Sequence, residues 1–395
     1  MLDKIKFKNY KLFKDLQELE LKPITILIGK NSSGKSAILK LPTLIENSLS
    51  GSFSEPLRMN NNGIELGGEF KDLIYGRQYG NLEISLANKI DKLDITINSG
   101  STITKISPKI LRWSLNNTLD LNYSGEKNEY QNEHNEENYN ADFEGFILKN
   151  LIFRDGESSE DIPSYNFILN TDYISSLRKE VDRYIEKSSK NNETVGLKGE
   201  NVYSILIEDA LTTPKELLKQ VSAFYQSNFE GWSIGVNEDN APPYQIELVN
   251  KKLKVNIKDV GLGMTQALPL VVRAFMPTKK ETLIIIEEPE LHLHPAAHGN
   301  LAQLFVESLT DKNKKYLIET HSPNFVLRLR RLVAEKKLDK EQLSIYYVDY
   351  DDVENESCLK KIEIDDLGKP SFWPKNIFSE TLDETSAIRT AQLNR

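Results

Sequence analysis

The chain has 395 residues, of which 39% are hydrophobic and 28% are charged, a composition typical of soluble globular proteins. No apolar run approaches the roughly 20 residues that cross a bilayer, and the N-terminus lacks an apolar signal segment. The single cysteine, Cys358, excludes an internal disulfide framework and favours a reducing compartment, so we expect a cytoplasmic protein. A net charge of −9 argues against a global basic field for nucleic acid, but DNA contact through a local basic groove stays compatible with it.

The clearest motif follows the apolar run at residues 23–28, where the chain reads Gly-Lys-Asn-Ser-Ser-Gly-Lys-Ser. This is the G-x-x-x-x-G-K-S pattern between a predicted strand and a helix-favouring segment, with glycines that let backbone N–H groups surround phosphate oxygens. We predict that Lys35 reaches the β- and γ-phosphates of a nucleotide and that the Ser36 hydroxyl ligates Mg²⁺. The predicted nucleotide-binding residues are Gly29, Lys30, Asn31, Ser32, Ser33, Gly34, Lys35, Ser36 and Ala37.

The next part of the chain favours antiparallel strands. Residues 64–107 contain short alternating runs separated by Asn, Asp and Gly. Gln78 lies among these runs, and we weigh it as a weak candidate for sensing the nucleotide at its metal ion. The polar stretch 125–142 is nearly free of aliphatic residues, so it predicts a mobile surface loop.

Residues 164–257 mix helical and strand patterns. We expect a strand at 164–169, helical character up to about residue 187, and helices from 202 to 229 with a break near Pro214. A hairpin is predicted at 244–257. The residues after it form a glycine-rich turn at a helix N-terminus, a place suited to an anion. The candidate residues of this turn are Gly261, Gly263, Thr265 and Gln266.

A second apolar strand, starting at Leu283, runs directly into Glu287 and Glu288 and is followed by a proline. A run that is apolar on both faces is typical of a central parallel strand, and ligands bind at the carboxyl ends of such strands. Two carboxylates there are costly unless a metal ion or a reacting water uses them. His321 ends another predicted strand of the same sheet, where it is placed to hydrogen-bond a phosphate.

Two other clusters are weaker candidates. His292, His294 and His298 lack supporting cysteines, so we do not favour a zinc site. The acidic residues Asp349–Asp352 lie between two predicted strands, which favours a hairpin turn over a nuclease carboxylate pair.

With these motifs in this order, the chain resembles ABC-type ATPases of the RecF/SMC/OLD group. It is similar to AAA-labelled prokaryotic ATPases of the kind found in anti-phage systems such as Gabija and Septu, in which the acidic strand reads Glu-Glu-Pro-Glu-x-His-x-His-Pro. The segment Thr320–Pro323 resembles the histidine switch of that family, and Tyr173–Arg178 resembles its tyrosine–leucine–arginine block. Residues 365–374 and 377–380 resemble a small tail found in some members.

The resemblance implies a homodimer, or a higher even-numbered oligomer, that sandwiches ATP and Mg²⁺. Each site then uses the phosphate loop of one subunit and the glycine-rich turn of the other, here called the signature turn, although this turn lacks the serine of the family pattern. Carried over, Glu287 supports the Mg²⁺ held by Ser36, Glu288 polarises the attacking water, and His321 senses the γ-phosphate beside Lys35.

We therefore expect an α/β fold: an ABC-type P-loop ATPase head with an antiparallel β subdomain and a mostly helical insertion. The head is expected at 1–165 and 232–364, the insertion at 166–231, and the tail at 365–395. The predicted function is slow ATP hydrolysis that switches a separate effector, a nuclease or toxin, in anti-phage defence or a related DNA transaction. The alternatives are an ATP-locked scaffold, a DNA repair ATPase that acts directly on DNA, and a transporter subunit, which the insertion and the divergent turn disfavour.

Overall fold

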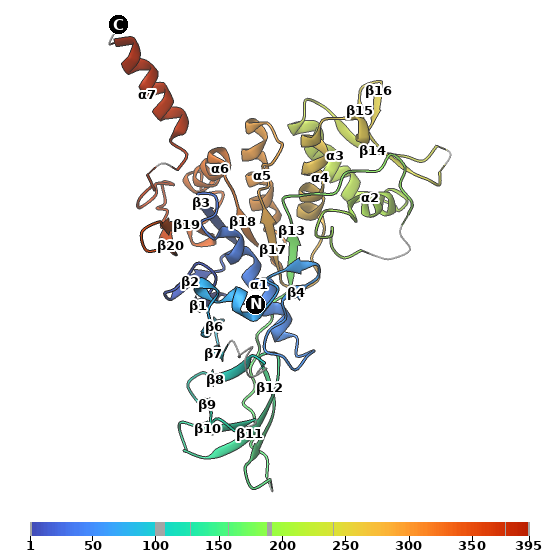
Figure 1. Ribbon diagram of the computed structural model, residues 1–395. Coiled ribbons are helices and arrows are strands. Elements are labelled where there is room, and N and C mark those ends of the chain that lie inside the picture. Colours follow the sequence, from blue (N-terminus) through green and yellow to red (C-terminus); the bar gives the residue numbers. More distant parts are fainter. Residues whose placement is uncertain are drawn as a thin grey trace.

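The computed structural model describes residues 2–98, 107–126, 128–156, 158–187, 192–239, 241–375 and 377–393. Within these residues the chain forms a six-stranded sheet, a nine-stranded sheet, a three-stranded sheet and a two-stranded ribbon (Figure 1). The six-stranded sheet lies at the centre, with the nine-stranded sheet below it and helices above it in this view. The predicted α/β class with an antiparallel subdomain is confirmed.

The central sheet has the order β13-β17-β18-β3-β19-β20, and all of its neighbouring strands are parallel except β19 and β20. Strands β3, β17 and β18 are buried on both faces over most of their length, which fits the apolar residues at their centres. Their parallel register brings their carboxyl ends to one edge. The strands are β3 (Ile24–Gly29), β13 (Thr171–Ile174), β17 (Thr282–Glu287), β18 (Lys314–Glu319), β19 (Leu343–Asp351) and β20 (Glu356–Ile362).

Helices cover both faces of this sheet. One face packs on α1 and on residues of the nine-stranded sheet, and the other packs on α4, α5 and α6. Alternation along β17 divides the two cores, because Ile284 and Ile286 lie under α4–α6 whereas Ile285 lies on the α1 side. The helices are α1 (Lys35–Leu49), α4 (Leu262–Phe275), α5 (Pro295–Ser308) and α6 (Pro323–Ala334).

The nine-stranded sheet is antiparallel, in the order β12-β11-β10-β9-β8-β7-β6-β1-β2. Its strands are β1 (Lys4–Lys8), β2 (Gln17–Glu20), β6 (Asn81–Ala87), β7 (Lys92–Asn98), β8 (Lys109–Leu115), β9 (Leu119–Tyr123), β10 (Glu129–Asn132), β11 (Asn138–Glu144) and β12 (Ile147–Phe153). The ribbon β4 (Asn60–Asn61) and β5 (Ile64–Glu65) and the short helices η1 (Phe70–Leu73) and η2 (Tyr75–Arg77) lie between β3 and β6 in sequence. The antiparallel strands predicted in 64–107 are confirmed by β6 and β7, and residues 99–106 lie outside the described residues.

The prediction of a mobile loop at 125–142 is wrong, because this stretch contains β10 and most of β11. Aromatic residues replace the missing aliphatic ones. Tyr130 and Tyr139 are 5% and 0% exposed, and the Tyr130 hydroxyl donates to the Ile110 carbonyl at 2.9 Å. The ring of Tyr130 also packs edge-on against Phe143 with centroids 5.3 Å apart. The polar composition of this stretch does not reveal that its tyrosines are buried in the core.

A separate lobe follows β13 and lies at the upper right of Figure 1. Two helices in 202–229 with a break near Pro214, and the hairpin at 244–257, are confirmed. The lobe differs from the predicted insertion 166–231, because β13 joins the central sheet and β14 packs against α3. Its elements are α2 (Val202–Ala210), α3 (Glu216–Asn228), β14 (Ser233–Asn237), β15 (Gln245–Asn250), β16 (Leu253–Asn256) and η3 (Ile257–Asp259).

Two further expectations in this region are wrong. Residues 164–169 pair with no described strand, and strand pairing begins only at Thr171. The segment 175–187 contains no helix and is irregular, with one isolated β-bridge in which Ile185 exchanges backbone hydrogen bonds with Tyr244 at 2.9 Å in both directions. Pairing with a distant strand overrides the local helical pattern here.

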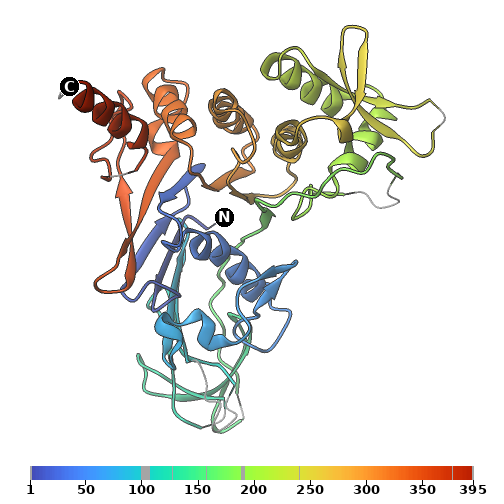
Figure 2. The same cartoon turned by 45° about the horizontal axis from the view of Figure 1, so that its top comes forward.

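The C-terminal part contains η4 (Lys340–Gln342) and α7 (Glu380–Leu393). Figures 1 and 2 show α7 projecting away from the rest of the molecule. Of the residues preceding α7, Trp373 stacks with Phe378 and lies against the guanidinium of Arg330. Among the described residues, no helix combines the length and the apolar character that crossing a membrane requires.

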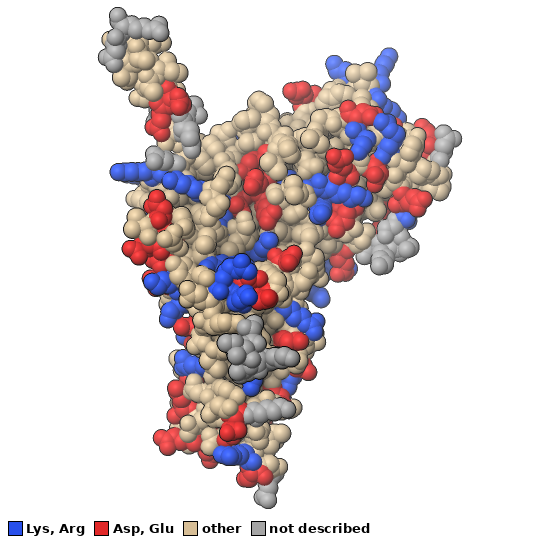
Figure 3. Space-filling model, viewed as in Figure 1, with Lys and Arg blue, Asp and Glu red and all other residues tan. Residues whose placement is uncertain are grey.

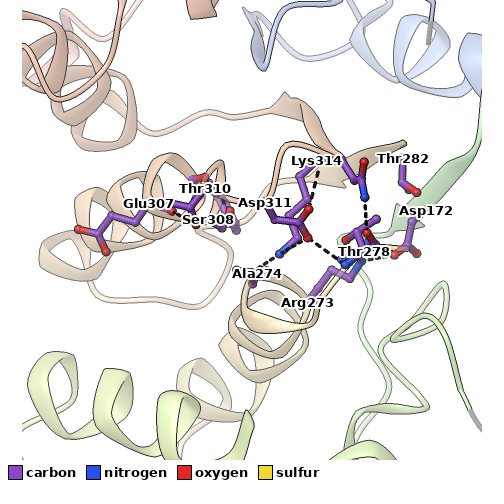
Figure 4. A network of polar contacts seen from close by, with 12 residues as sticks. Asp172, Arg273, Ala274, Thr278, Thr282, Glu307, Ser308, Thr310, Asp311 and Lys314 are labelled. Carbon is purple, nitrogen blue, oxygen red and sulfur yellow. Dashed lines mark hydrogen bonds and ion pairs between the residues drawn. The ribbon is translucent and has the colours of Figure 1, made fainter. Parts of the chain in front are cut away.

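A buried polar network holds the C-terminal end of α4 against the starts of β13 and β18 (Figure 4). Arg273 forms an ion pair with Asp172, and both side chains are almost fully buried. Lys314 donates to the Ala274 carbonyl at 2.7 Å and lies 3.6 Å from the Asp311 carboxylate. Burial lowers the pKa of Lys314 to about 8. The helix that begins at the signature turn is thus anchored at its far end.

Candidate functional site

The loop Gly29–Ser36 joins β3 to α1 in the way the motif predicts. A side chain at Gly29 would place its Cβ 2.6 Å from the Val348 carbonyl oxygen, so β19 leaves room only for glycine there. Gly34 has a φ of 99° and caps α1, whose first N–H groups receive no side-chain cap. Those N–H groups and the positive end of the helix dipole are therefore available to an anion.

Lys35 is buried and folds back into this loop. Its Nζ donates to the Gly29 carbonyl at 3.0 Å and to the Lys30 carbonyl at 2.6 Å. The Nζ also lies 3.6 Å from a carboxylate oxygen of Glu319. Burial lowers the pKa of Lys35, while Glu319 and Glu288 oppose the shift. The ammonium group is thus held between backbone carbonyls and a carboxylate, at the floor of the loop.

A cavity of about 490 Å³ opens above the loop. Of the predicted nucleotide-binding residues, Asn31, Ser32 and Gly34 to Ala37 line its wall. Ser33 is buried beneath, and its hydroxyl has no hydrogen-bond partner among the described residues. The rest of the lining comes from α1 and from other strands and loops, and consists of Tyr10, Lys11, Leu12, Lys40, Glu65, Leu66, Glu288, Glu319 and His321.

Glu319 is the main residue of this site that the sequence did not single out. It ends β18, which the strand order places between β3 and β17, and it accepts a hydrogen bond from the Ser36 hydroxyl at 3.2 Å. Burial raises the pKa of Glu319 to about 7; Lys35 opposes the shift, and Glu287 and Glu288 add to it. The sequence does show that Glu319 follows the apolar residues of a strand. It does not show that Glu319 lies beside Ser36, because that contact depends on the order of the strands in the sheet.

Glu287 does not point its carboxylate at Ser36, in contrast to the predicted role beside Mg²⁺. The carboxylate instead accepts hydrogen bonds from the Tyr173 hydroxyl, from the backbone N–H of Ser176 at 3.0 Å, and from the Ser176 hydroxyl at 3.2 Å. Strand β13 pairs with β17, so the end of β13 and the loop that follows it lie beside the Glu287 carboxylate. The hydrogen bonds of this carboxylate therefore go to Tyr173 and Ser176 and not to the phosphate loop.

Glu288 and His321 lie together beyond the phosphate loop. Glu288 has a φ of 39°, which is unusual for a residue with a side chain, and its N–H donates to the Glu319 carbonyl at 3.0 Å. Strained backbone of this kind clusters at functional sites. Burial and the nearby Lys35 lower the pKa of His321, and its Nε2 lies 3.9 Å from Glu319. The ring is therefore placed to act as a neutral hydrogen-bonding group.

The donor set fits a hard divalent cation. The ligating atoms of Glu288, Glu319 and His321 lie within 4.8 Å of one another, and the Ser36 hydroxyl adjoins Glu319. Three of these four groups are oxygen donors, which Mg²⁺ prefers. The carboxylates of Glu287 and Glu288 add to the effect of burial in raising the pKa of Glu319, whereas Lys35 lowers it. Gln78 is exposed and is not part of the cavity wall.

The signature turn lies at the start of α4, away from the cavity wall. Gly261 is exposed and forms an N-cap without a side-chain hydrogen bond, and the next residue, Leu262, is 53% exposed. Thr265 and Gln266 are buried, and the Thr265 hydroxyl donates to the Leu262 carbonyl at 2.9 Å. The turn therefore offers backbone N–H groups to solvent, whereas its two polar side chains support it from within.

Two of the other histidines, His294 and His298, have local partners. The His294 ring caps α5 by accepting from the Ala296 N–H at 3.3 Å. The His298 ring contacts the Ser322 hydroxyl at 2.7 Å and the Leu293 carbonyl at 3.1 Å. Asp349 pairs with Lys360 across β19 and β20, so the predicted hairpin at this acidic run is confirmed.

Solved structures of SMC head domains are similar to this chain. A SmcHead bound to the C-winged helix domain of ScpA is 14% identical, with a TM-score of 0.46 and coverage of 92% of this chain and 98% of that chain. The SMC head domain from Thermotoga maritima is 11% identical, with a TM-score of 0.43 and coverage of 92% and 99%. The Smc head domain with an extended coiled coil, bound to the C-terminal domain of ScpA and derived from Pyrococcus furiosus, is 12% identical, with a TM-score of 0.47 and coverage of 98% and 99%.

No curated protein matches the sequence. A family model described as an AAA ATPase domain matches residues 1–326. This match contains the phosphate loop, the signature turn, the acidic pair Glu287 and Glu288 at the end of β17, and His321. The chain therefore belongs to the AAA ATPase domain family.

Proposed function

We propose that the protein binds and hydrolyses ATP between two subunits and uses the resulting dimer as a switch for a separate effector protein. The observation that carries the proposal is the arrangement at one sheet edge: Lys35 and Ser36 from the phosphate loop meet Glu319, Glu288 and His321 around a single cavity. Family membership supports the ATPase activity. The dimer, the metal ion and the effector are inferences from the geometry and the resemblance.

Nucleotide binding follows from the phosphate loop. The uncapped start of α1 supplies N–H groups and a positive dipole end, and Lys35 adds a full charge beside them. When phosphates enter, Lys35 exchanges its contacts with the Gly29 and Lys30 carbonyls for phosphate oxygens. Binding therefore replaces neutral acceptors by charged ones, which make stronger hydrogen bonds.

Hydrolysis requires a positioned water and stabilisation of charge on the γ-phosphate. We assign the water to Glu288, whose backbone is fixed by the Glu319 carbonyl, and the contact to the γ-phosphate to His321. Ser36 and Glu319 would hold Mg²⁺, which supplies charge stabilisation when bound. Glu287 lies behind them, and its hydrogen bonds to Tyr173 and Ser176 suit a supporting role.

The exposed start of α4 is the reason to expect a dimer. Its uncapped N–H groups suit a phosphate, but the turn contributes nothing to the cavity wall of its own subunit among the described residues. A second copy that brings its phosphate loop to this turn would complete both sites. An even-numbered assembly that closes on ATP is therefore the simplest use of the turn.

The effector role rests on the resemblance to anti-phage ATPases, in which hydrolysis controls a separate nuclease or other toxic protein. In this proposal the protein works in the cytoplasm and slow turnover sets the lifetime of the closed state. Lys and Arg side chains are interspersed with Asp and Glu over the face shown in Figure 3, so the described residues of this face do not form an extended basic surface of the kind that binds DNA. A scaffold that needs ATP but not hydrolysis is the alternative.

The test compares steady-state ATP hydrolysis and nucleotide affinity for the wild type and three variants. Lys35→Ala should lose ATP binding, whereas Glu319→Gln should keep binding of free ATP and lose most of the gain that Mg²⁺ provides. Glu287→Gln is the matched control, and it should retain more of the Mg²⁺ dependence than Glu319→Gln. Equal activity of wild type and Lys35→Ala would contradict the proposed function, and a stronger effect of Glu287→Gln would return the metal role to Glu287.

A further inference from the structure

The segment Tyr173–Arg178 lies beside the acidic pair and contacts it directly. It leaves the end of β13 and crosses the carboxyl end of β17, where Glu287 and Glu288 lie. Tyr173 and Ser176 fix the Glu287 carboxylate through three hydrogen bonds. The last residue of the segment, Arg178, makes a different set of contacts, which reach from this acidic pair to another element.

Arg178 joins the signature turn to the acidic pair through backbone carbonyls. Its Nη1 donates to the Gln266 carbonyl at 3.3 Å. Its Nη2 donates to the Glu287 carbonyl at 3.1 Å and to the Glu288 carbonyl at 3.3 Å. Gln266 lies in the first turns of α4, so one rigid guanidinium fixes the start of this helix relative to the residue that we assign to the attacking water.

The chain of contacts continues on the other side of Glu288. The Glu290 carboxylate accepts from the Thr320 hydroxyl at 2.9 Å and from the His321 N–H at 2.5 Å. Arg178 therefore joins the signature turn to the acidic pair, and Glu290, two residues further along the chain than Glu288, continues the path to His321. Such a path couples two sites when the elements that it joins move together.

The burial of Arg178 argues against a role in stability alone. The side chain is 7% exposed, and its Nε has no hydrogen-bond partner among the described residues. Burial lowers the pKa of Arg178 to about 10, although Glu290, Glu287 and Glu288 oppose the shift. A buried cation of this kind stabilises a fold less than apolar packing of the same volume. An apolar side chain could fill the same space, but it could not donate hydrogen bonds to three carbonyls as the Arg178 guanidinium does.

We propose that Arg178 is a positioning residue that transmits closure of the partner subunit on the signature turn to Glu288 in the same subunit. This inference rests on the proposed function, because it needs ATP hydrolysis in a two-subunit site. When the partner's nucleotide presses on the start of α4, Arg178 carries that displacement to the Glu287 and Glu288 backbone. Glu288 is then set for its own water only in the closed assembly.

The experiment measures ATP affinity and kcat per bound nucleotide for Arg178→Met and Arg178→Lys. Because nothing in these contacts reaches the phosphate loop, affinity should stay within about twofold of the wild type. The kcat per bound nucleotide should fall on the order of 10- to 100-fold in Arg178→Met, as expected when a reacting group is misplaced. The kcat of Arg178→Lys should lie between those of the wild type and Arg178→Met, because the lysine amine keeps the positive charge but does not reach all three carbonyls.

Arg183→Met is the matched control. Arg183 lies on the same stretch of chain, is exposed, and pairs with Asp259 just before the signature turn, so its loss should leave kcat unchanged. Normalising to bound nucleotide removes the effect of any unfolded fraction. An unchanged kcat in Arg178→Met, or a loss of kcat equal to that of Arg183→Met, would overturn the inference. A wild type without ATPase activity would instead overturn the proposed function.

Discussion

The buried ion pair between Arg273 and Asp172 predicts a large loss of stability when one partner is removed. Both side chains are nearly fully buried, at 3% and 5% exposed, and they join the last turn of α4 to the start of β13. In Arg273→Met, the buried Asp172 carboxyl group loses its ion-pair partner. Breaking a buried pair in this way costs about 3–5 kcal/mol, whereas replacing both charges is often nearly neutral.

The assay is equilibrium unfolding in urea at pH 7.5, with the wild type, both single variants and the pair Asp172→Leu with Arg273→Met. We expect each single variant to lose about 3–5 kcal/mol in free energy of unfolding. The double variant should lose less than the sum, with a coupling energy of roughly 2 kcal/mol or more. Strict additivity, or a loss below about 1 kcal/mol in Arg273→Met, would refute a paired, desolvated arginine at this position.

Three more predictions use features of the same helix and of the cavity. Burial lowers the pKa of Lys314 to about 8, so above that pH the unfolded state holds a proton that the folded state has lost. Lys314 should therefore contribute about 3 kcal/mol of added stability between pH 8 and 10.5, which unfolding experiments measure as the difference in pH dependence between the wild type and Lys314→Met. Gly263→Ala would place a Cβ 2.6 Å from the His292 carbonyl oxygen and should cost about 1–3 kcal/mol in thermal unfolding, whereas Gly261→Ala, with open space around its Cβ, should be nearly neutral. Gln78→Ala should leave ATP affinity and kcat unchanged, since Gln78 lies outside the cavity wall; a tenfold loss would restore it as a nucleotide-sensing residue.

The parts of the site that could be predicted are those that depend only on residues close together in the sequence. The loop Gly29–Ser36 requires glycines and a strand–loop–helix context, and both are visible within about a dozen residues. Glu288 and His321 follow apolar runs, which identifies them as residues at the carboxyl ends of buried strands. Local order along the chain was enough for these residues.

The parts that were missed depend on which strands become neighbours. Glu319 meets Ser36 only because β18 inserts between β3 and β17, and no feature of Tyr316–His321 specifies that order. Glu287 turns toward Tyr173 because β13 joins the edge of the sheet beside β17. In the same way, Ile185 pairs with Tyr244 from a distant hairpin and removes a helix that the local pattern favours.

The most direct test of ATP-driven assembly is the native mass of Glu288→Gln protein purified from its own host, with and without Mg-ATP. Blocking hydrolysis should trap the closed state, so we expect ATP to shift the mass to an even-numbered assembly, together with a second polypeptide if the effector proposal holds. Lys35→Ala in the same background should stay at the mass seen without nucleotide. A mass that ATP does not change, in a protein shown to bind ATP, would contradict a nucleotide site shared between subunits.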